Sequence, residues 1–218
     1  RDSAGVGAGA GAAAGAAPGA PPMLPRLPNT AAEIVALSSL AGGRPIEVLT
    51  GREATRDRLL ALAGLQRASL IHVATHGVAN EVEPERSGLW LAAPPGANGP
   101  GFVSVSDILA LKLGAGLVTL SACETGLGRL ERGEGVVGLT RAFLAAGAQS
   151  VMVSLWKVND RSTALLMERF YRGLLKDGAP GAAALAQAKR ALLKNAETRS
   201  PFYWAPFVLA GSAGRLGG

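Results

Sequence analysis

Two chemically reactive side chains each stand directly after a stretch typical of a buried strand. Ser69–Thr75 precedes His76, one of two histidines, and Leu117–Ala122 precedes Cys123, the single cysteine. A thiol needs a base or a dipole to become a thiolate near neutral pH, and a neutral imidazole can take its proton and later protonate a leaving amine. A lone strand cysteine is more often a small buried hydrophobe. The matching position of His76 nevertheless favours a nucleophile, Cys123, with a general acid/base, His76.

Gly77 adds a third component to this candidate site. Because glycine has no Cβ, its backbone amide can approach a substrate closely. Together with the amide of Cys123 it could stabilise an oxyanion that develops during attack on a carbonyl group.

Other chemistries have fewer residues to support them. A metal site of His72, His76 and Cys123 lacks a fourth ligand and the spacing of zinc motifs, so we expect His72 to be a strand histidine satisfied by hydrogen bonds. The glycines of Gly126–Gly128 and Gly133 do not have the spacing of a dinucleotide-binding loop. No Gly-x-Ser-x-Gly or His-Glu-x-x-His motif occurs. The sequence therefore predicts neither a metal nor a cofactor.

The elements that must position these residues alternate between two patterns. Thr30–Glu33 reads as a capping box that opens a first helix, with Ser104 or Ser106 capping a later one. Asp160 is expected to cap a helix as well, although Asn159 is an equally good candidate, and Trp156 reads as an aromatic core residue. Strand patterns occur at 46–50, 69–75, 89–91, 102–103, 117–122, 150–156 and 203–210, and helical patterns follow at 105–113, 136–146, 161–176 and 182–194.

Apolar strands that alternate with amphipathic helices predict an α/β fold with a mostly parallel central sheet covered by helices on both faces. Binding and catalytic sites in such sheets form beyond the carboxyl ends of the strands. His76 and Cys123 both stand at such ends, so we expect them at the same edge.

Composition bounds the possible functions. The 218 residues are 48% hydrophobic and 17% charged, and no long apolar run suggests a membrane span. The net charge of +6 is dispersed among acidic residues, and aromatic residues make up only 5% of the chain, so nucleic-acid binding is not expected. A single cysteine excludes an internal disulfide. We expect a cytoplasmic protein with a solvated basic surface.

The chain divides into a linker, a domain and a tail. Residues 1–22 contain nine Ala, six Gly and three Pro, too little apolar surface to offset the entropy of ordering them. We expect a flexible linker at 1–27, one domain at 28–213 and a flexible tail at 214–218. Because the chain begins with Arg1, we also expect it to be cut from a longer protein with a regulatory region upstream.

Two sequence blocks resemble the signatures of the CHAT domain family, the caspase-like domains often found with tetratricopeptide repeats. The blocks are Leu70–Gly77 (LIHVATHG) and Val118–Gly126 (VTLSACETG). Later blocks are similar to the family's in the same order: Gly133–Ala148, Val153–Asp160, Leu165–Tyr171 and Phe202–Leu209. The resemblance covers about Pro28 to Gly211.

This resemblance implies a three-layer caspase/separase-type fold, hydrolysis through a dyad of His76 and Cys123, and no obligatory cofactor. It also implies control by an upstream module such as tetratricopeptide repeats. Similarity of the block that ends at Asp160 to the corresponding separase segment implies a pocket that selects a basic residue before the scissile bond. Asp160 would be its anionic floor and Trp156 its wall, beside the capping and core roles given above.

Three functions stay open from the sequence. The first is a cysteine endopeptidase acting on protein substrates. The second is a catalytically silent caspase-like domain that signals by binding partners, and the third is a nucleotide binder. Retention of both His76 and Cys123 favours the first.

Overall fold

A computed structural model of the chain describes residues 24, 27, 29–78, 86–97, 100–121, 123–124, 134–156, 160–212 and 214. Its helices are α1 (Asn29–Leu40), α2 (Arg56–Leu60), α3 (Val105–Leu109), α4 (Glu134–Ala145), α5 (Asp160–Leu175) and α6 (Gly181–Lys194). Its strands are β1 (Leu70–Val73), β2 (His76–Val78), β3 (Gly88–Leu91), β4 (Gly101–Ser104), β5 (Leu117–Leu120), β6 (Cys123–Glu124), β7 (Ser150–Ser154) and β8 (Phe207–Gly211). Short 3-10 helices occupy Gly51–Glu53, Ala63–Gln66 and Pro201–Tyr203.

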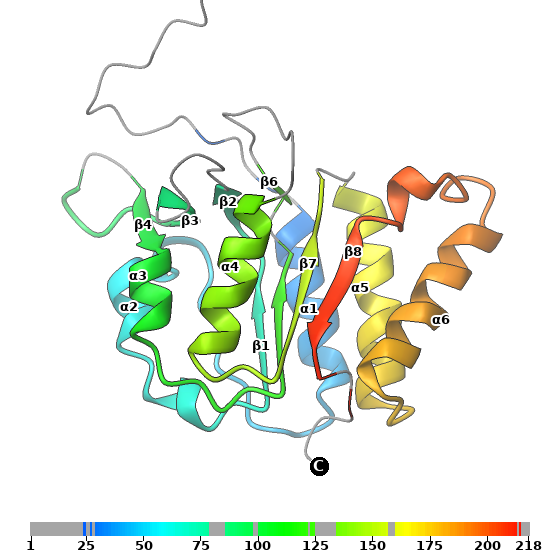
Figure 1. Cartoon of the computed structure of the whole chain (residues 1–218), viewed down its shortest axis with the longest axis horizontal. Coiled ribbons are helices and arrows are strands. Elements are labelled where there is room, and N and C mark those ends of the chain that lie inside the picture. Colours follow the sequence, from blue (N-terminus) through cyan, green and yellow to red (C-terminus); the bar gives the residue numbers. More distant parts are fainter. Residues whose placement is uncertain are drawn as a thin grey trace, which may run out of the picture.

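The strands form two hydrogen-bonded groups, with orders β1-β5-β7-β8 and β4-β3-β2-β6. Strands β1, β5 and β7 are parallel, as are β2 and β6, whereas β8, β3 and β4 join antiparallel to their neighbours. Strand β2 follows β1 after two residues, and β6 follows β5 after two residues. The β1–β5 pair of the first group therefore continues upward as the β2–β6 pair of the second group (Figure 1).

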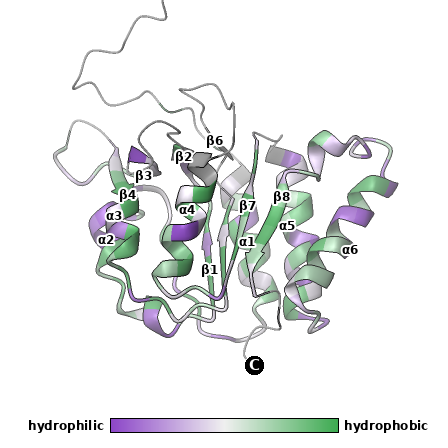
Figure 2. Cartoon of the chain, in the orientation of Figure 1, coloured by the Kyte–Doolittle hydropathy of each residue, from purple (hydrophilic) through white to green (hydrophobic). Residues whose placement is uncertain are grey.

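Helices cover both faces, which completes the three-layer, mostly parallel α/β architecture predicted from the sequence (Figure 1). One apolar cluster packs α3 and α4 on the strands, through residues such as Ile108, Leu139 and Phe143. A second cluster packs α1, α5 and α6 on the other face, around Met152, Phe170 and Leu192. Figure 2 shows β8 in the green of hydrophobic residues and green alternating with purple along α6, as expected for a helix with one buried face.

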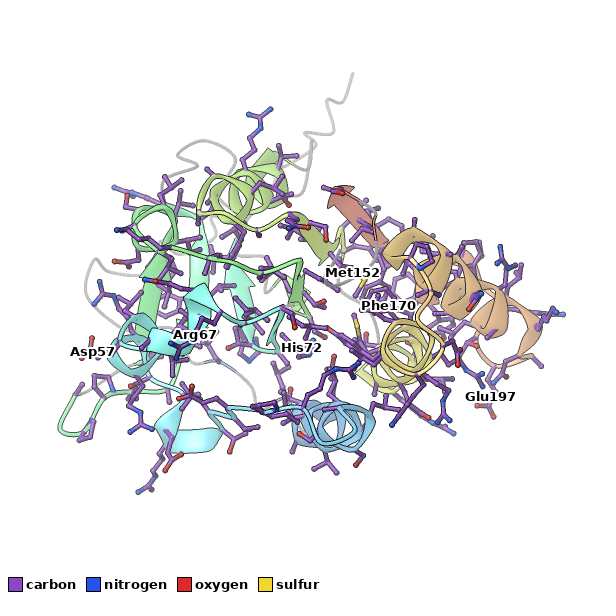
Figure 3. All side chains as sticks on the ribbon, turned by 90° about the horizontal axis from the view of Figure 1, so that it is seen from below. Asp57, Arg67, His72, Met152, Phe170 and Glu197 are labelled. Carbon is purple, nitrogen blue, oxygen red and sulfur yellow. The ribbon has the colours of Figure 1, made fainter. Side chains whose placement is uncertain are left out.

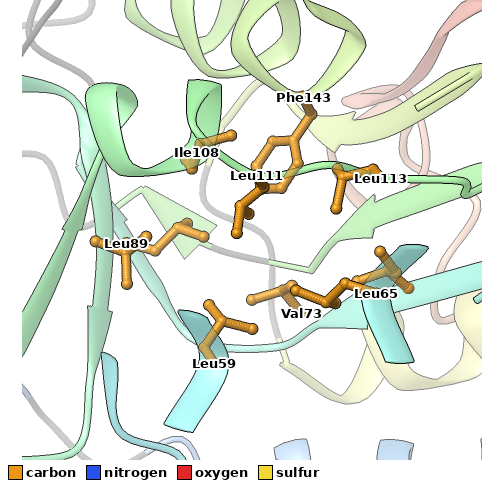
Figure 4. A pocket seen from close by; sticks show the side chains of 10 residues that line it. Leu59, Leu65, Val73, Leu89, Ile108, Leu111, Leu113 and Phe143 are labelled. Atoms are coloured by element: carbon orange, nitrogen blue, oxygen red, sulfur yellow. The ribbon is translucent and has the colours of Figure 1, made fainter. Parts of the chain in front are cut away.

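An apolar cavity lies within the α3–α4 layer (Figure 4). It is lined by aliphatic and aromatic side chains only, among them Leu59, Val73, Leu89, Ile108 and Phe143. A space without polar partners stays dry, so this cavity is a packing gap in the core.

Several expected local features are confirmed. Ser104 caps α3, and its hydroxyl and the carboxylate of Asp107 form a reciprocal capping box. Gly147 ends the turn after α4 at φ 113°, where an added Cβ would meet the carbonyl of Leu113. Strands β3 and β4 pair as the expected hairpin. Within the described residues, no helix combines the length and apolar character that a membrane crossing needs.

Three expected features differ from the structure. The segment 46–50 has no regular structure and is mostly exposed, so its strand-like sequence has no neighbouring strand to pair with. Glu33 is not the acidic partner of a capping box: α1 already begins at Asn29, and the Glu33 carboxylate is buried against other elements. The last strand also begins later than expected, at Phe207, after a 3-10 turn.

Candidate active site

His76 and Cys123 are register partners on the neighbouring parallel strands β2 and β6. The next pair along the same strands joins Gly77 to Glu124. Adjacent strands lie about 4.8 Å apart, and in a parallel pair the partners project to the same face. The fold therefore brings the backbones of the two expected dyad residues side by side at the carboxyl end of the sheet.

This pairing continues the register of the lower strands. His72 of β1 is the register partner of Thr119 of β5. His76 stands four residues after His72, and Cys123 stands four residues after Thr119. Because both strands are interrupted by the same number of residues, the register passes through the break unchanged.

Residues 74–75 and 121–122 interrupt the two strands, and hydrogen bonds to neighbouring strands hold this break in place. The amide of Ser121 donates to the carbonyl of Val73 at 2.9 Å, which links the two interrupted strands. On the other side, the Thr75 hydroxyl donates to the carbonyl of Trp90 in β3. Ser121 and Thr75 each belong to the interruption just before a candidate catalytic residue.

His76 is buried, with 8% of its surface exposed, and Gly77 beside it is also buried. Strand β2 lies between β6 and β3, where His76 pairs with Trp90 and Gly77 with Leu89. Neighbours on both sides therefore fix the backbone that carries the candidate acid/base. The proposed part of the Gly77 amide in an oxyanion hole stays a prediction.

His72 belongs to a buried polar network under this pair, and not to the reacting edge. Its Nδ1 lies 2.9 Å from the Tyr171 hydroxyl, and Tyr171 donates to the Thr119 hydroxyl at 2.7 Å. Figure 3 shows His72 in the interior, near α1 and α5. The expected hydrogen bonding of this strand histidine is therefore met at Nδ1, whereas Nε2 has no hydrogen-bond partner among the described residues.

The other side of the His72 ring faces a carboxylate. Nε2 lies 3.0 Å from Oε1 of Glu33, within ion-pair distance although the contact is not a well-aligned hydrogen bond. The second carboxylate oxygen, Oε2, accepts from the Ser121 hydroxyl at 3.2 Å. Glu33 thus contacts both β1 and the residue that follows β5.

Tyr171 is fully buried on α5 and its ring packs edge-on against His72, with centroids 5.5 Å apart. Burial raises the pKa of the Tyr171 phenol well above its ordinary value. The hydroxyl therefore keeps its proton at any physiological pH and can donate to Thr119 while accepting from His72.

The two residues expected to form a specificity pocket lie past the end of β7. Trp156 is half-buried against the α5–α6 cluster, and its indole nitrogen donates to the Phe202 carbonyl at 3.2 Å. Asp160 is the first residue of α5. Its side chain lies outside what the structure describes, as does Asn159, so its capping and pocket roles both stay predictions.

Sequence reasoning missed Glu33, Ser121 and Tyr171 as members of the site's support. A signal for Glu33 was present, because it is spaced with Leu37 and Leu40 along one helical face, which points it into the protein. No comparable signal marks Tyr171. Among the described residues, no three histidine, cysteine or acidic side chains are grouped so that they could hold a metal ion.

Comparisons with known proteins show to which family the chain is related. Tetratricopeptide repeat protein 28 of Mus musculus is 30% identical over 226 residues, which cover 87% of this chain and 9% of that protein. Its counterpart in Homo sapiens is 29% identical over 221 residues, with the same coverage of each chain. The chain thus spans about a tenth of the length of these relatives. The family description "CHAT domain" matches residues 6–212, so the chain belongs to the caspase-like CHAT domain family.

Proposed function

We propose that this chain is a cysteine endopeptidase domain in which Cys123 is the nucleophile and His76 the general acid/base. The register pairing of these two residues at the carboxyl end of parallel strands carries the proposal. Residues paired on adjacent parallel strands have neighbouring backbones, which supports proton transfer between an imidazole and a thiol carried there.

The reaction proceeds in two halves. His76 takes the thiol proton, and the Cys123 sulfur attacks the scissile carbonyl carbon to form a tetrahedral oxyanion, which the amides of Gly77 and Cys123 stabilise. Collapse of this intermediate breaks the C–N bond, and His76 returns the proton to the leaving amine. Water, deprotonated by His76, then attacks the thioester and releases the carboxylate product and the thiol.

The preferred substrate has a basic residue, above all Arg, before the scissile bond. Strand β7 pairs with β5, the strand that leads to Cys123, and Trp156 and Asp160 follow β7 in the chain, which supports a pocket beside the candidate nucleophile. A carboxylate there can bind a guanidinium through two charge-assisted hydrogen bonds, which lysine matches only in part.

An upstream module controls this activity. The chain matches only 9% of each tetratricopeptide repeat relative, and α1 is the first helix that the structure describes. Tetratricopeptide repeats, or a similar helical array, before α1 would hold the peptidase until a protein partner binds.

Alkylation by iodoacetamide tests the dyad directly, because the chain has a single cysteine. We expect native protein to react faster at pH 7 than the same chain unfolded in guanidinium chloride, and His76→Ala to lose this advantage. Cleavage of an Arg-containing peptide library should fall at least about 10³-fold in Cys123→Ala and in His76→Ala.

Unchanged cleavage by Cys123→Ala would contradict the nucleophile assignment. A native thiol no more reactive than the unfolded one, together with no cleavage by the full-length protein, would instead indicate a silent interaction domain. Circular dichroism of each variant checks that the fold is retained.

A further inference from the structure

Glu33 is a buried carboxylate, 6% exposed, on a helix remote in sequence from the candidate dyad. Removing a carboxylate from water costs several kcal/mol unless charges and hydrogen bonds replace the water. Its two oxygens meet His72 of β1 and Ser121, the residue that follows β5. The buried Glu33 carboxylate therefore holds these two segments in a fixed relative position.

The contacts of Glu33 bracket the strand break that precedes the dyad. His72 is in β1, before the interruption that leads to His76, and Ser121 is in the interruption between β5 and Cys123. The Ser121 amide is bonded to Val73 across the same gap. A shift of α1 that moved Glu33 would therefore act on both strands where they leave the lower sheet.

We propose that Glu33 is a positioning residue that holds the two interrupted strands so that His76 and Cys123 stay in register. The inference rests on the proposed function, since it assigns a purpose to the register that the dyad needs. Catalytic groups displaced by about 1 Å lose rates on the order of 10²-fold, so a small slip at the break has a large effect.

The network beneath the break supports this assignment. The Tyr171 hydroxyl, which itself donates to Thr119, bonds the His72 ring on the side away from Glu33, so the imidazole has a fixed orientation. A fixed imidazole gives the carboxylate a rigid support on β1, and the remaining oxygen of Glu33 holds Ser121 against that support. We call these contacts of Glu33 with His72 and Ser121 the clamp. The clamp acts on the segment that leads to Cys123 through a single side-chain hydrogen bond, the one from Ser121.

The test uses four single variants in two matched pairs. Glu33→Ala removes the clamp, and Glu53→Ala removes an exposed glutamate of the first 3-10 helix. Ser121→Ala removes only the hydrogen bond to Glu33, and Ser38→Ala removes a hydroxyl that bonds within α1 to the Ile34 carbonyl. The measurements are kcat and KM for an Arg-containing peptide, the pH profile of iodoacetamide alkylation, and the denaturation midpoint.

We expect Glu33→Ala and Ser121→Ala each to lower kcat by about 10- to 100-fold with little change in KM. Their alkylation rates should follow the pH dependence of the unfolded chain. The double variant Glu33→Ala/Ser121→Ala should have about the same kcat as the less active of the two single variants, because both changes open the same clamp. Glu33→Gln, whose amide oxygen can still accept from Ser121, should recover most of the rate.

The assignment would be overturned if the losses of kcat in the two single variants multiplied in the double variant. Full activity of a folded Ser121→Ala protein would also overturn it. If Glu33→Ala fails to fold, Ser121→Ala and Glu33→Gln still decide it. Failure of the proposed function is separable: wild-type protein would then cleave nothing, yet a change in Cys123 alkylation on loss of the clamp would still support positioning by Glu33.

Discussion

At the scale of single residues, the Tyr171 hydroxyl is a buried polar group that joins two others. It lies in a fully buried position between Thr119 and His72, and burial raises the pKa of its phenol. Its removal leaves two buried polar groups without that partner. The cost of such a loss comes from the groups left behind more than from the bond itself.

Tyr171→Phe should therefore lower the free energy of unfolding by about 1–3 kcal/mol. Urea denaturation measures the change. Tyr203→Phe is the matched control, since it alters the chain's other tyrosine, which is half-buried in a 3-10 helix. Equal stability of the two variants would show that the network beneath the break contributes little.

Asp160→Asn separates the two roles given to that residue. Asparagine caps a helix about as well as aspartate but cannot neutralise a bound cation, so the variant should stay folded. If Asp160 has the proposed pocket role, the preference for Arg over apolar residues should fall by one to several orders of magnitude, about 2–5 kcal/mol for an unpaired charge. A peptide library measures the preference, with the exposed Asp177→Asn as control. Unchanged selectivity would leave Asp160 as a cap.

At the scale of elements, side-chain capping fixes where α3 begins. Asp107 accepts from the Ser104 amide and from Arg56, whose guanidinium approaches to 2.5 Å. The hydrogen bond from Arg56 is the main reason that the pKa of Asp107 lies below its ordinary value of 3.8. A lowered pKa in the fold means that this carboxylate stabilises the protein above pH 3.8, and that the contribution is lost as the pH falls through the folded value.

Asp107→Asn should thus be less stable than wild type at pH 7, by under about 1 kcal/mol because the Arg56 side chain is partly exposed and its charge is screened. The difference should shrink as the pH is lowered below 3.8. Thermal unfolding from pH 7 to pH 2 measures it. A difference that grows on acidification would contradict the assigned sign.

The elements also show how far the sequence predicts this structure. Alternation of apolar strands and amphipathic helices correctly predicts the layers, and the position of His76 and Cys123 after strand patterns predicts their common edge. The strand expected at 46–50 fails because strand propensity needs a partner. Glu33 is misread because a local capping signal and a long-range contact use the same carboxylate, and only the fold decides between them.

At the scale of the whole molecule, the strands β1, β5, β7 and β8 separate two apolar clusters. Ile108 belongs to the α3–α4 side and Leu166 to the α5–α6 side, and both are fully buried. Side chains on opposite faces share no contacts across a sheet, so each cluster responds to truncation on its own. The sheet nevertheless joins them into a single cooperative unit.

Ile108→Val should cost about 0.5–1.5 kcal/mol and Leu166→Ala about 2–5 kcal/mol. The double variant should lose the sum of the two within about 0.5 kcal/mol. Chemical denaturation followed by tryptophan fluorescence and by circular dichroism measures all three. Transitions that differ between the probes would show that the two layers unfold separately.

The equal length of the two strand interruptions constrains which changes of chain length the protein can tolerate. Two residues separate Val73 from His76, and two separate Leu120 from Cys123. Deleting one residue from either interruption would displace one strand by a full position against the other, and a one-residue slip turns side chains to the opposite face. Insertions and deletions at these sites therefore keep the register of His76 with Cys123 only as a matched pair, one in each strand.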